Sequence, residues 1–267
     1  MIGPFRSARR QMAMARELVP FLFTPPTEGL IFVTAADSSH YLSLGHFLTS
    51  LWQHDDPTAV VVFDLGLRTE EHDLLSRHFP RAQLRLFDYS SYPDYFNIKV
   101  QAGQYAWKPV ILAGVAEEFR ASVCWMDAGN VVTSRLVWLR KILRSIGLYS
   151  PASKGRIRDW THPKTLEYLG AGPDLLDRRN LNGACVAVDY RSIPAMKVLK
   201  RWKECALIRE CIAPHGSDRN NHRQDQSVLS VLCHQMGLAE RMPTYPHGFR
   251  THGDIQSDPP RLPLPGS

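Results

Sequence analysis

Carboxylate side chains follow two apolar, β-rich segments, a pattern that can build a ligand site. Asp127 comes directly after segment 122–126, with Gly129 two residues later, and Asp37 stands just after segment 30–35. A carboxylate at the end of a strand can bind a divalent cation or a ribose hydroxyl. Asp127 can equally cap the segment that follows, and short motifs often match by chance, so both interpretations stay open on local evidence.

The C-terminal half offers polar residues suited to a sugar. Asn182 and Gly183 enter an apolar segment, and an amide can hydrogen-bond a sugar hydroxyl, although Asn-Gly is also typical of a plain turn. Asp225 and Gln226 open a predicted helix, where N-capping is the alternative role for the carboxylate. The segment 221–226 is rich in side chains that can contact a sugar or a phosphate.

Lys108 and His247 are candidate contacts for phosphate or metal. Lys108 follows Tyr105 and Trp107 at a predicted helix start, where it can meet a phosphate; a solvated lysine is the alternative. His247 lies in a Pro-His-Gly turn, where neutral imidazole can bind a metal ion or simply lie on the surface. The sequence contains no nucleophile elbow, Walker loop or G-x-G-x-x-G motif. Their absence argues against the common classes of hydrolase and of nucleotide-binding protein that carry these motifs.

Alternating strands and helices position these residues. Apolar periodicity predicts strands at 30–35, 59–63, 83–87 and 122–126, separated by helices at 41–52, 69–79 and 110–119. We expect Thr69 to cap its helix. This order predicts an α/β fold with a mostly parallel central sheet and helices on both faces. Ligands of such sheets bind beyond the carboxyl ends of the strands, where the polar residues stand.

The second half is more mixed. It predicts helices at 138–146, 194–209 and 225–236, short strands at 147–150 and within 182–189, and polar loops at 153–160 and 214–224. We expect one domain over 1–267, with a helical extension at 1–28 and a mobile, proline-rich tail at 254–267.

The 267-residue chain carries a net charge of +6, which suits an anionic ligand such as a nucleotide diphosphate. Its basic residues form no stripe with aromatics, so no nucleic-acid partner is expected. No apolar run reaches the roughly 18 residues of a membrane span, and the start lacks the apolar core of a signal peptide. Peripheral membrane contact through 12–23 is the alternative to a helix packed on the domain.

The five cysteines form an odd set without C-x-x-C spacing, which predicts reduced thiols, no structural zinc and a cytoplasmic location. Cys124 and Cys185 are expected in the core. A bridge between Cys205 and Cys211 is conceivable only in an oxidising compartment.

In this order, the motifs resemble those of the GT-A glycosyltransferases, most closely family 8 and its relatives. Met126-Asp127-Ala128-Gly129 is similar to the family's Leu-Asp-Ala-Asp, Asp225-Gln226 to its Asp-Gln pair, and Lys108 stands where the family has a lysine. The other matching pieces are Ala36-Asp37 with Tyr41, Asn182-Gly183, and His247-Gly248 with altered spacing. The resemblance extends over roughly residues 30–252, and the shared order is its main support.

The resemblance implies a GT-A-like fold and transfer of a hexosyl group from a nucleotide-diphosphate sugar to a hydroxyl acceptor, in glycan or polysaccharide synthesis. It implies that the nucleoside is held by Asp37 and Tyr41, the ribose or metal by Asp127, and the phosphates by Lys108 and His247. Catalytic contacts to the sugar would come from Asn182, Asp225 and Gln226.

The resemblance also implies a Mn²⁺ or Mg²⁺ ion, bound here by Asp127 and His247. Gly129 departs from the family pattern because it replaces the second aspartate, a principal metal ligand. The basic residues that could partly replace the cation are Lys108, Arg156, Arg158 and Arg223.

Two other classes stay open: a catalytically reduced carbohydrate- or nucleotide-binding module, which Gly129 favours, and a nucleotidyltransferase on a related sheet. The second class usually has a glycine- and lysine-rich phosphate loop after the first strand, where this chain has Asp37-Ser38-Ser39-His40.

Overall fold

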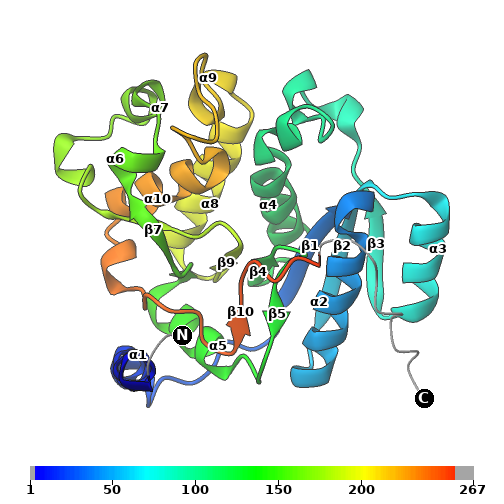
Figure 1. The fold of residues 1–267 in the computed structure, drawn as a ribbon, viewed down its shortest axis with the longest axis horizontal. Helices are drawn as coiled ribbons and strands as arrows, with labels where there is room; N and C mark the ends of the chain where they lie inside the picture. The colour runs from blue at the N-terminus through cyan, green and yellow to red at the C-terminus, as the bar shows by residue number, and fades with distance from the viewer. Residues whose placement is uncertain (1–3, 256–267) are drawn as a thin grey trace.

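A six-stranded sheet forms the centre of the structure, a computed structural model that describes residues 4–255. Its strand order is β3 (Ala82–Leu86), β2 (Ala59–Gly66), β1 (Ile31–Asp37), β4 (Val123–Met126), β9 (Cys185–Val188) and β6 (Leu148–Tyr149) (Figure 1). The strands β1 to β4 run parallel, whereas β9 is antiparallel to both of its neighbours. The predicted α/β fold with a mostly parallel sheet is confirmed.

Helices cover the sheet because its central strands are apolar along their whole length. All of β4 is buried, and β1 is buried up to Asp37, so side chains on both faces need cover. The helices are α1 (Pro4–Leu18), α2 (Tyr41–His54), α3 (Thr69–His78), α4 (Trp107–Phe119), α5 (Val137–Ile146), α6 (Ile157–Trp160), α7 (Pro163–Tyr168), α8 (Ile193–Ala206), α9 (Arg209–Ile212) and α10 (Gln224–Gln235). Of these, α2 packs on β1, while α4 lies between β4 and α8.

Shorter elements complete the chain. Two small antiparallel sheets pair β5 (Val131–Val132) with β10 (Phe249–Arg250) and β7 (Ala152–Arg156) with β8 (Arg179–Leu181). Single 3₁₀ turns cover Val19–Phe21, Ser38–His40, Tyr89–Ser91, Asp94–Phe96, Gln101–Tyr105, Pro173–Leu175 and Ala239–Arg241. The buried apolar residues form one cluster that runs from Phe21 to Phe249.

Two local predictions are wrong. Segment 153–160 is not a loop, because it forms most of β7 and all of α6; β7 is stabilised by pairing with β8, about 25 residues away in sequence. Thr69 is the first helical residue of α3 and not its cap, since Arg68 occupies that position and its backbone N–H donates to Glu71 at 2.9 Å.

The first helix contacts the body of the protein through specific hydrogen bonds. Glu17 at the end of α1 accepts hydrogen bonds from the backbone N–H groups of Thr244 (2.9 Å) and Tyr245 (3.2 Å). Phe23, just after this helix, is 98% exposed. The predicted tail lies outside the described residues apart from Asp254 and Ile255. No helix among residues 4–255 has the length and apolarity to cross a membrane.

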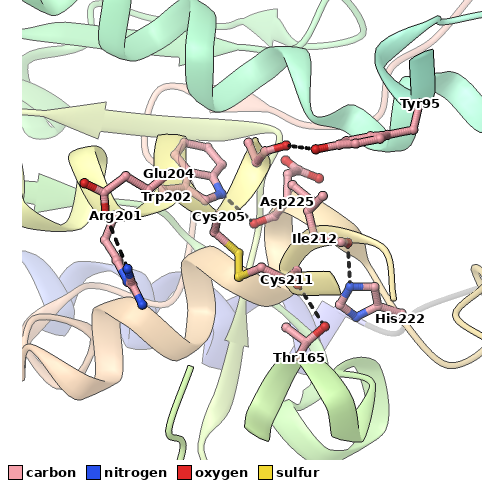
Figure 2. The surroundings of a disulfide bond; sticks show 11 residues. Tyr95, Thr165, Arg201, Trp202, Glu204, Cys205, Cys211, Ile212, His222 and Asp225 are labelled. Carbon is pink, nitrogen blue, oxygen red and sulfur yellow. Dashed lines mark hydrogen bonds and ion pairs between the residues drawn. A yellow bond between two sulfur atoms is a disulfide. The ribbon is translucent and has the colours of Figure 1, made fainter. Parts of the chain in front are cut away.

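A disulfide between Cys205 and Cys211 joins the end of α8 to α9, with the Cα atoms 5.3 Å apart (Figure 2). The prediction of reduced thiols is therefore wrong for this pair, and the count is odd because Cys124, Cys185 and Cys233 are buried free thiols. Disulfides persist mainly in oxidising compartments, so the bridge does not favour the predicted cytoplasmic location.

Reduction of this bridge is expected to lower the free energy of unfolding by roughly 2 kcal/mol, because a short closed loop constrains the unfolded chain. Urea unfolding with and without dithiothreitol measures the change. The double variant Cys205→Ser, Cys211→Ser is the control and should not respond to the reductant. Equal unfolding midpoints for the oxidised and reduced wild-type protein would show that the bridge contributes nothing.

Candidate active site

A cavity of about 580 Å³ lies at the carboxyl ends of β1 and β4. Asp37 reaches it from the end of β1, Asp127 from the end of β4, and Asp225 from the first turn of α10. The predicted site residues that line the cavity are Asp37, Lys108, Asp127, Asn182, Asp225 and Gln226. Tyr41 and His247 are not among the lining residues. The fold therefore brings together side chains from five separate segments of the chain.

Lys108 is the central cation of this cavity. Its Nζ lies 2.9 Å from Asp127 Oδ1 and 3.2 Å from Asp225 Oδ2, and it donates a hydrogen bond to the backbone oxygen of Gly183 at 3.0 Å. Burial lowers the pKa of Lys108, but the two carboxylates outweigh it and raise the pKa above its ordinary value. The side chain is only 3% exposed, so the solvated lysine considered above is wrong.

Aromatic rings and a left-handed turn position Lys108. Its Nζ lies 5.7 Å from the ring centre of Tyr105 and 5.4 Å from that of Trp125. The turn Gln101–Tyr105 before α4 has positive φ at all five residues, a conformation that is costly for side-chain-bearing residues and clusters at functional sites. Gly103 is required within it, because a Cβ there would collide with the backbone oxygen of Phe96.

Asp225 is a buried carboxylate that lines the cavity and pairs with Lys108. Burial raises its pKa, Lys108 opposes this effect, and the charge of Asp127 adds to it. Its Oδ2 makes no hydrogen bond of good geometry, although the 3.2 Å contact with Lys108 is an ion pair. Gln224, the preceding residue, has a φ of 39°, a left-handed value that is rare outside glycine. The carboxylate is thus held at the wall of the cavity by its ion pair with Lys108.

Two amides flank this carboxylate. Asn182 Oδ1 accepts from the backbone N–H of Ala184 at 3.0 Å, and Gln226 Oε1 accepts from the backbone N–H of Gly183 at 3.3 Å. Each amide uses its oxygen within the protein, and its NH₂ group makes no hydrogen bond to another described residue. Both side chains therefore present donors to the cavity, which suits the oxygen atoms of a sugar.

His40 lines the cavity beside Asp37, although its sequence context does not predict a site residue. Its Nδ1 lies 3.0 Å from Asp37 Oδ1; this hydrogen bond raises the pKa of His40 and lowers that of Asp37. The 3₁₀ turn Ser38–His40 presents Ser39 and His40 to the cavity, whereas Tyr41 begins α2 and does not line it. The segment Asp37-Ser38-Ser39-His40 follows a predicted strand, but no sequence pattern in it identifies His40 as a residue of the site.

His247 lies outside the cavity. Its side chain is 5% exposed, its Nε2 lies 3.9 Å from Glu17 Oε2, and burial lowers its pKa. After His247 the chain forms β10, which pairs with β5. The residue that follows this pairing and lines the cavity is His252. The predicted pairing of His247 with Asp127 around one ligand is therefore not formed, because the two residues face different surroundings.

The surroundings of Asp127 do not fit the metal site that the resemblance implies. Asp127 Oδ1 is already bound by Lys108 and by Trp125 Nε1, which donates at 2.6 Å. The carboxylate of Asp254 occupies the space that a side chain at Gly129 would take. Among residues 4–255, no group of three or more His, Cys, Asp or Glu side chains is arranged to hold a metal ion. The buried ammonium group of Lys108 thus neutralises the carboxylate where a cation would be expected.

The predicted surrogate cations divide into two groups. Arg156 and Arg158 both pair with Asp177 and do not line the cavity. Lys108 and Arg223 do line it.

The six-stranded sheet has the GT-A-like fold of the glycosyltransferase structures to which the chain is similar. The galactosyltransferase LgtC, in complex with donor and acceptor sugar analogues, matches with a TM-score of 0.50 and 15% identity, over 80% of this chain and 72% of that chain. An active-site mutant of LgtC gives 0.51 and 14%, over 80% and 71%. At such identities the likeness shows the fold alone.

Other comparisons are weaker. Mouse xyloside xylosyltransferase 1 gives a TM-score of 0.48 with 9% identity, over 81% of this chain and 84% of that chain. The bifunctional glycosyltransferase WbbM gives 0.49 with 12% identity over 84% of this chain, which spans only 39% of WbbM. A family model described as a protein of unknown function (DUF1647) matches residues 23–113, less than half of the chain. The search of curated proteins found no match to this chain.

Proposed function

We propose that the protein is a glycosyltransferase that moves a hexosyl group from a nucleotide-diphosphate sugar to a hydroxyl group of an acceptor glycan. The observation that carries this proposal is the convergence of Asp127, Asp225 and Lys108 on one cavity at the carboxyl edge of a GT-A sheet. Ligands of open α/β sheets bind at this edge. The three residues come from separate elements and share no local sequence motif.

In this proposal each side of the cavity has its own role. Asp37 and His40 hold the nucleoside, because their linked side chains line the β1 side of the cavity. Asp127 faces the ribose, while Asn182 and Gln226 donate to the transferred sugar. Tyr41, which does not line the cavity, has no direct contact in this arrangement. Lys108 is a positioning residue, since its three N–H donors are directed at Asp127, Asp225 and Gly183.

The reaction breaks the bond between the anomeric carbon and the diphosphate oxygen and forms a bond to the acceptor oxygen, while the hydroxyl proton passes to the departing diphosphate. Positive charge develops on the sugar in the transition state and negative charge on the diphosphate. Asp225 is placed to stabilise the first of these charges, because it is buried and lines the cavity. Most of the remaining rate enhancement comes from positioning of the two substrates.

A panel of UDP- and GDP-sugars in a thermal-shift assay tests the proposal. A ligand that binds only the folded state raises Tm, so at least one sugar nucleotide is expected to raise it. A Tm that stays constant with every nucleotide sugar, with and without Mn²⁺, would contradict donor binding.

The same panel tests the role of metal. We expect excess EDTA to leave the Tm shift of the bound sugar nucleotide unchanged, because the described residues around Asp127 do not form a metal site. Mn²⁺ should add less than a further degree or so at saturating donor. A Tm shift that appears only with Mn²⁺ would contradict a metal-free donor site.

One observation favours a second candidate, a binding module with reduced catalysis: Gly129 removes a carboxylate that active relatives use, as the resemblance implies. The two candidates differ in turnover. Release of free nucleoside diphosphate from the bound sugar nucleotide, even slowly and without acceptor, is expected of the enzyme and not of the module.

A further inference from the structure

Three cationic side chains line the cavity without an acidic partner. Lys154, Arg219 and Arg223 face it, and none forms an ion pair with a carboxylate of the described residues. Arg156 and Arg158, which stand outside the cavity on the same stretch of chain, share Asp177. Arginine binds carboxylate and phosphate groups alike through charge-assisted, often bidentate hydrogen bonds, so the arginines in the cavity keep this capacity for a ligand. These three cations are thus unpaired within the described residues, although four aspartates also line the cavity.

Both arginines rest on aromatic rings. The guanidinium carbon of Arg223 lies 4.1 Å from the ring centre of Trp160, and that of Arg219 lies 5.3 Å from the ring centre of Tyr105. Arg219 Nη1 also donates to the hydroxyl oxygen of Tyr105 at 2.6 Å. A guanidinium that stacks on a ring keeps N–H donors along its edge, where they can bind a phosphate, sulfate or carboxylate in two-point fashion.

The backbone fixes the Trp160 side of this arrangement. Trp160 Nε1 donates to the backbone oxygen of Lys154 at 3.0 Å, and the backbone oxygen of Trp160 accepts from the backbone N–H of Arg223 at 3.0 Å. Gly155 has a φ of +84°, and a Cβ there would collide with the Trp160 ring. The ring and the arginine that stacks on it are therefore held in one unit, which reduces the entropy lost on ligand binding.

The two arginines also oppose each other. Burial lowers the pKa of Arg223, and the charge of Arg219 lowers it further. Two guanidinium groups that repel each other, neither paired with a carboxylate of the described residues, are stabilised when an anion binds.

We propose that Arg219, Arg223 and Lys154 form an oxyanion subsite that binds the phosphate, sulfate or carboxylate group of a substrate in this cavity. The subsite needs no metal ion. The identity of its ligand rests on the proposed transferase function: the anion is either the diphosphate of the donor or an acidic group of the acceptor glycan. Because the chemistry is the same, the two sources must be separated by experiment.

Isothermal titration of the double variant Arg219→Gln, Arg223→Gln tests the subsite. The matched control is Arg156→Gln, Arg158→Gln, which removes two arginines outside the cavity. The probes are UDP and GDP for the donor, a sulfated chondroitin disaccharide for an acidic acceptor, and lactose as a neutral sugar. We expect the double variant to lose at least about tenfold in affinity for one class of anionic probe, with the control unchanged.

The loss of affinity for one class of probe identifies the source of the anion. Loss for UDP or GDP assigns the subsite to the donor diphosphate, and loss for the sulfated disaccharide assigns it to the acceptor. Equal affinities of the double variant and the control for every anionic probe would overturn the proposal. If no nucleoside diphosphate binds any form of the protein, the transferase proposal fails, while loss for the sulfated disaccharide would still support the subsite.

The salt dependence of the affinity for the anionic probe gives a second measurement. It uses only the wild-type protein, so it does not require that a variant folds. The affinity for the bound anionic probe should fall at least about threefold between 50 and 300 mM NaCl, because screening weakens the contact with exposed cations such as Arg219. An affinity that does not change with salt would also overturn the proposal.

Discussion

Replacement of Asp225 by Asn is expected to lower kcat by roughly 100-fold or more while the protein stays folded. The carboxylate is buried and lines the cavity, so its charge lies close to the transition state. Asn has the same shape, and Lys108 keeps Asp127 and the Gly183 oxygen as partners. The assay is release of nucleoside diphosphate from the donor that the thermal-shift panel identifies.

The pH dependence of stability provides a readout of folding for the same variant. Burial raises the folded-state pKa of Asp225 above the ordinary value of 3.8, so the folded protein binds this proton more tightly than the unfolded chain does. This residue therefore adds stability as the pH falls through its folded-state pKa toward 3.8. Asp225→Asn should remove that gain, which urea unfolding at a series of pH values from neutral downward can measure.

Asp177→Asn is the matched control for both measurements, because Asp177 is an exposed carboxylate outside the cavity. It should keep wild-type kcat and leave the gain in stability at low pH in place. Wild-type turnover by Asp225→Asn would remove Asp225 from the catalytic role proposed here.

The second large effect is expected for Lys108→Met, which should lower the free energy of unfolding by about 3–5 kcal/mol. Without the ammonium group, Asp127 and the buried Asp225 lose their shared cation, and each carboxylate repels the other. Equilibrium urea unfolding at neutral pH measures the loss. Lys200→Met, an exposed lysine with no ion pair to a described residue, should change stability by less than about 0.5 kcal/mol.

A double variant separates charge from packing. Adding Asp225→Asn to Lys108→Met removes one of the two unpaired charges, so it should restore about 1–3 kcal/mol of the lost stability. Activity should not return, since Asp225 is still missing. If Lys108→Met alone were as stable as the wild-type protein, the ion pairs would not hold this site together.

The sequence determined which side chains follow the strands of the sheet. Apolar segments of strand length and the helices between them set the direction of the parallel strands, and this direction places the residues after β1 and β4 at one edge. Asp37 and Asp127 could be assigned to the cavity for that reason alone. Asn182 and Asp225 came from the order of motifs that resembles a family, and the fold places both at the same cavity.

Only the tertiary structure decided which of two nearby residues lines the cavity and which cation pairs with the carboxylates. His40 faces the cavity in place of Tyr41, and His252 in place of His247, because a 3₁₀ turn and a short strand pairing set their orientation. The burial of Lys108 depends on two carboxylates that follow it by 19 and 117 positions in the chain. Such contacts join residues that are distant in sequence, and the free energy that favours them exists only once the chain has folded, so no local pattern of residues records them.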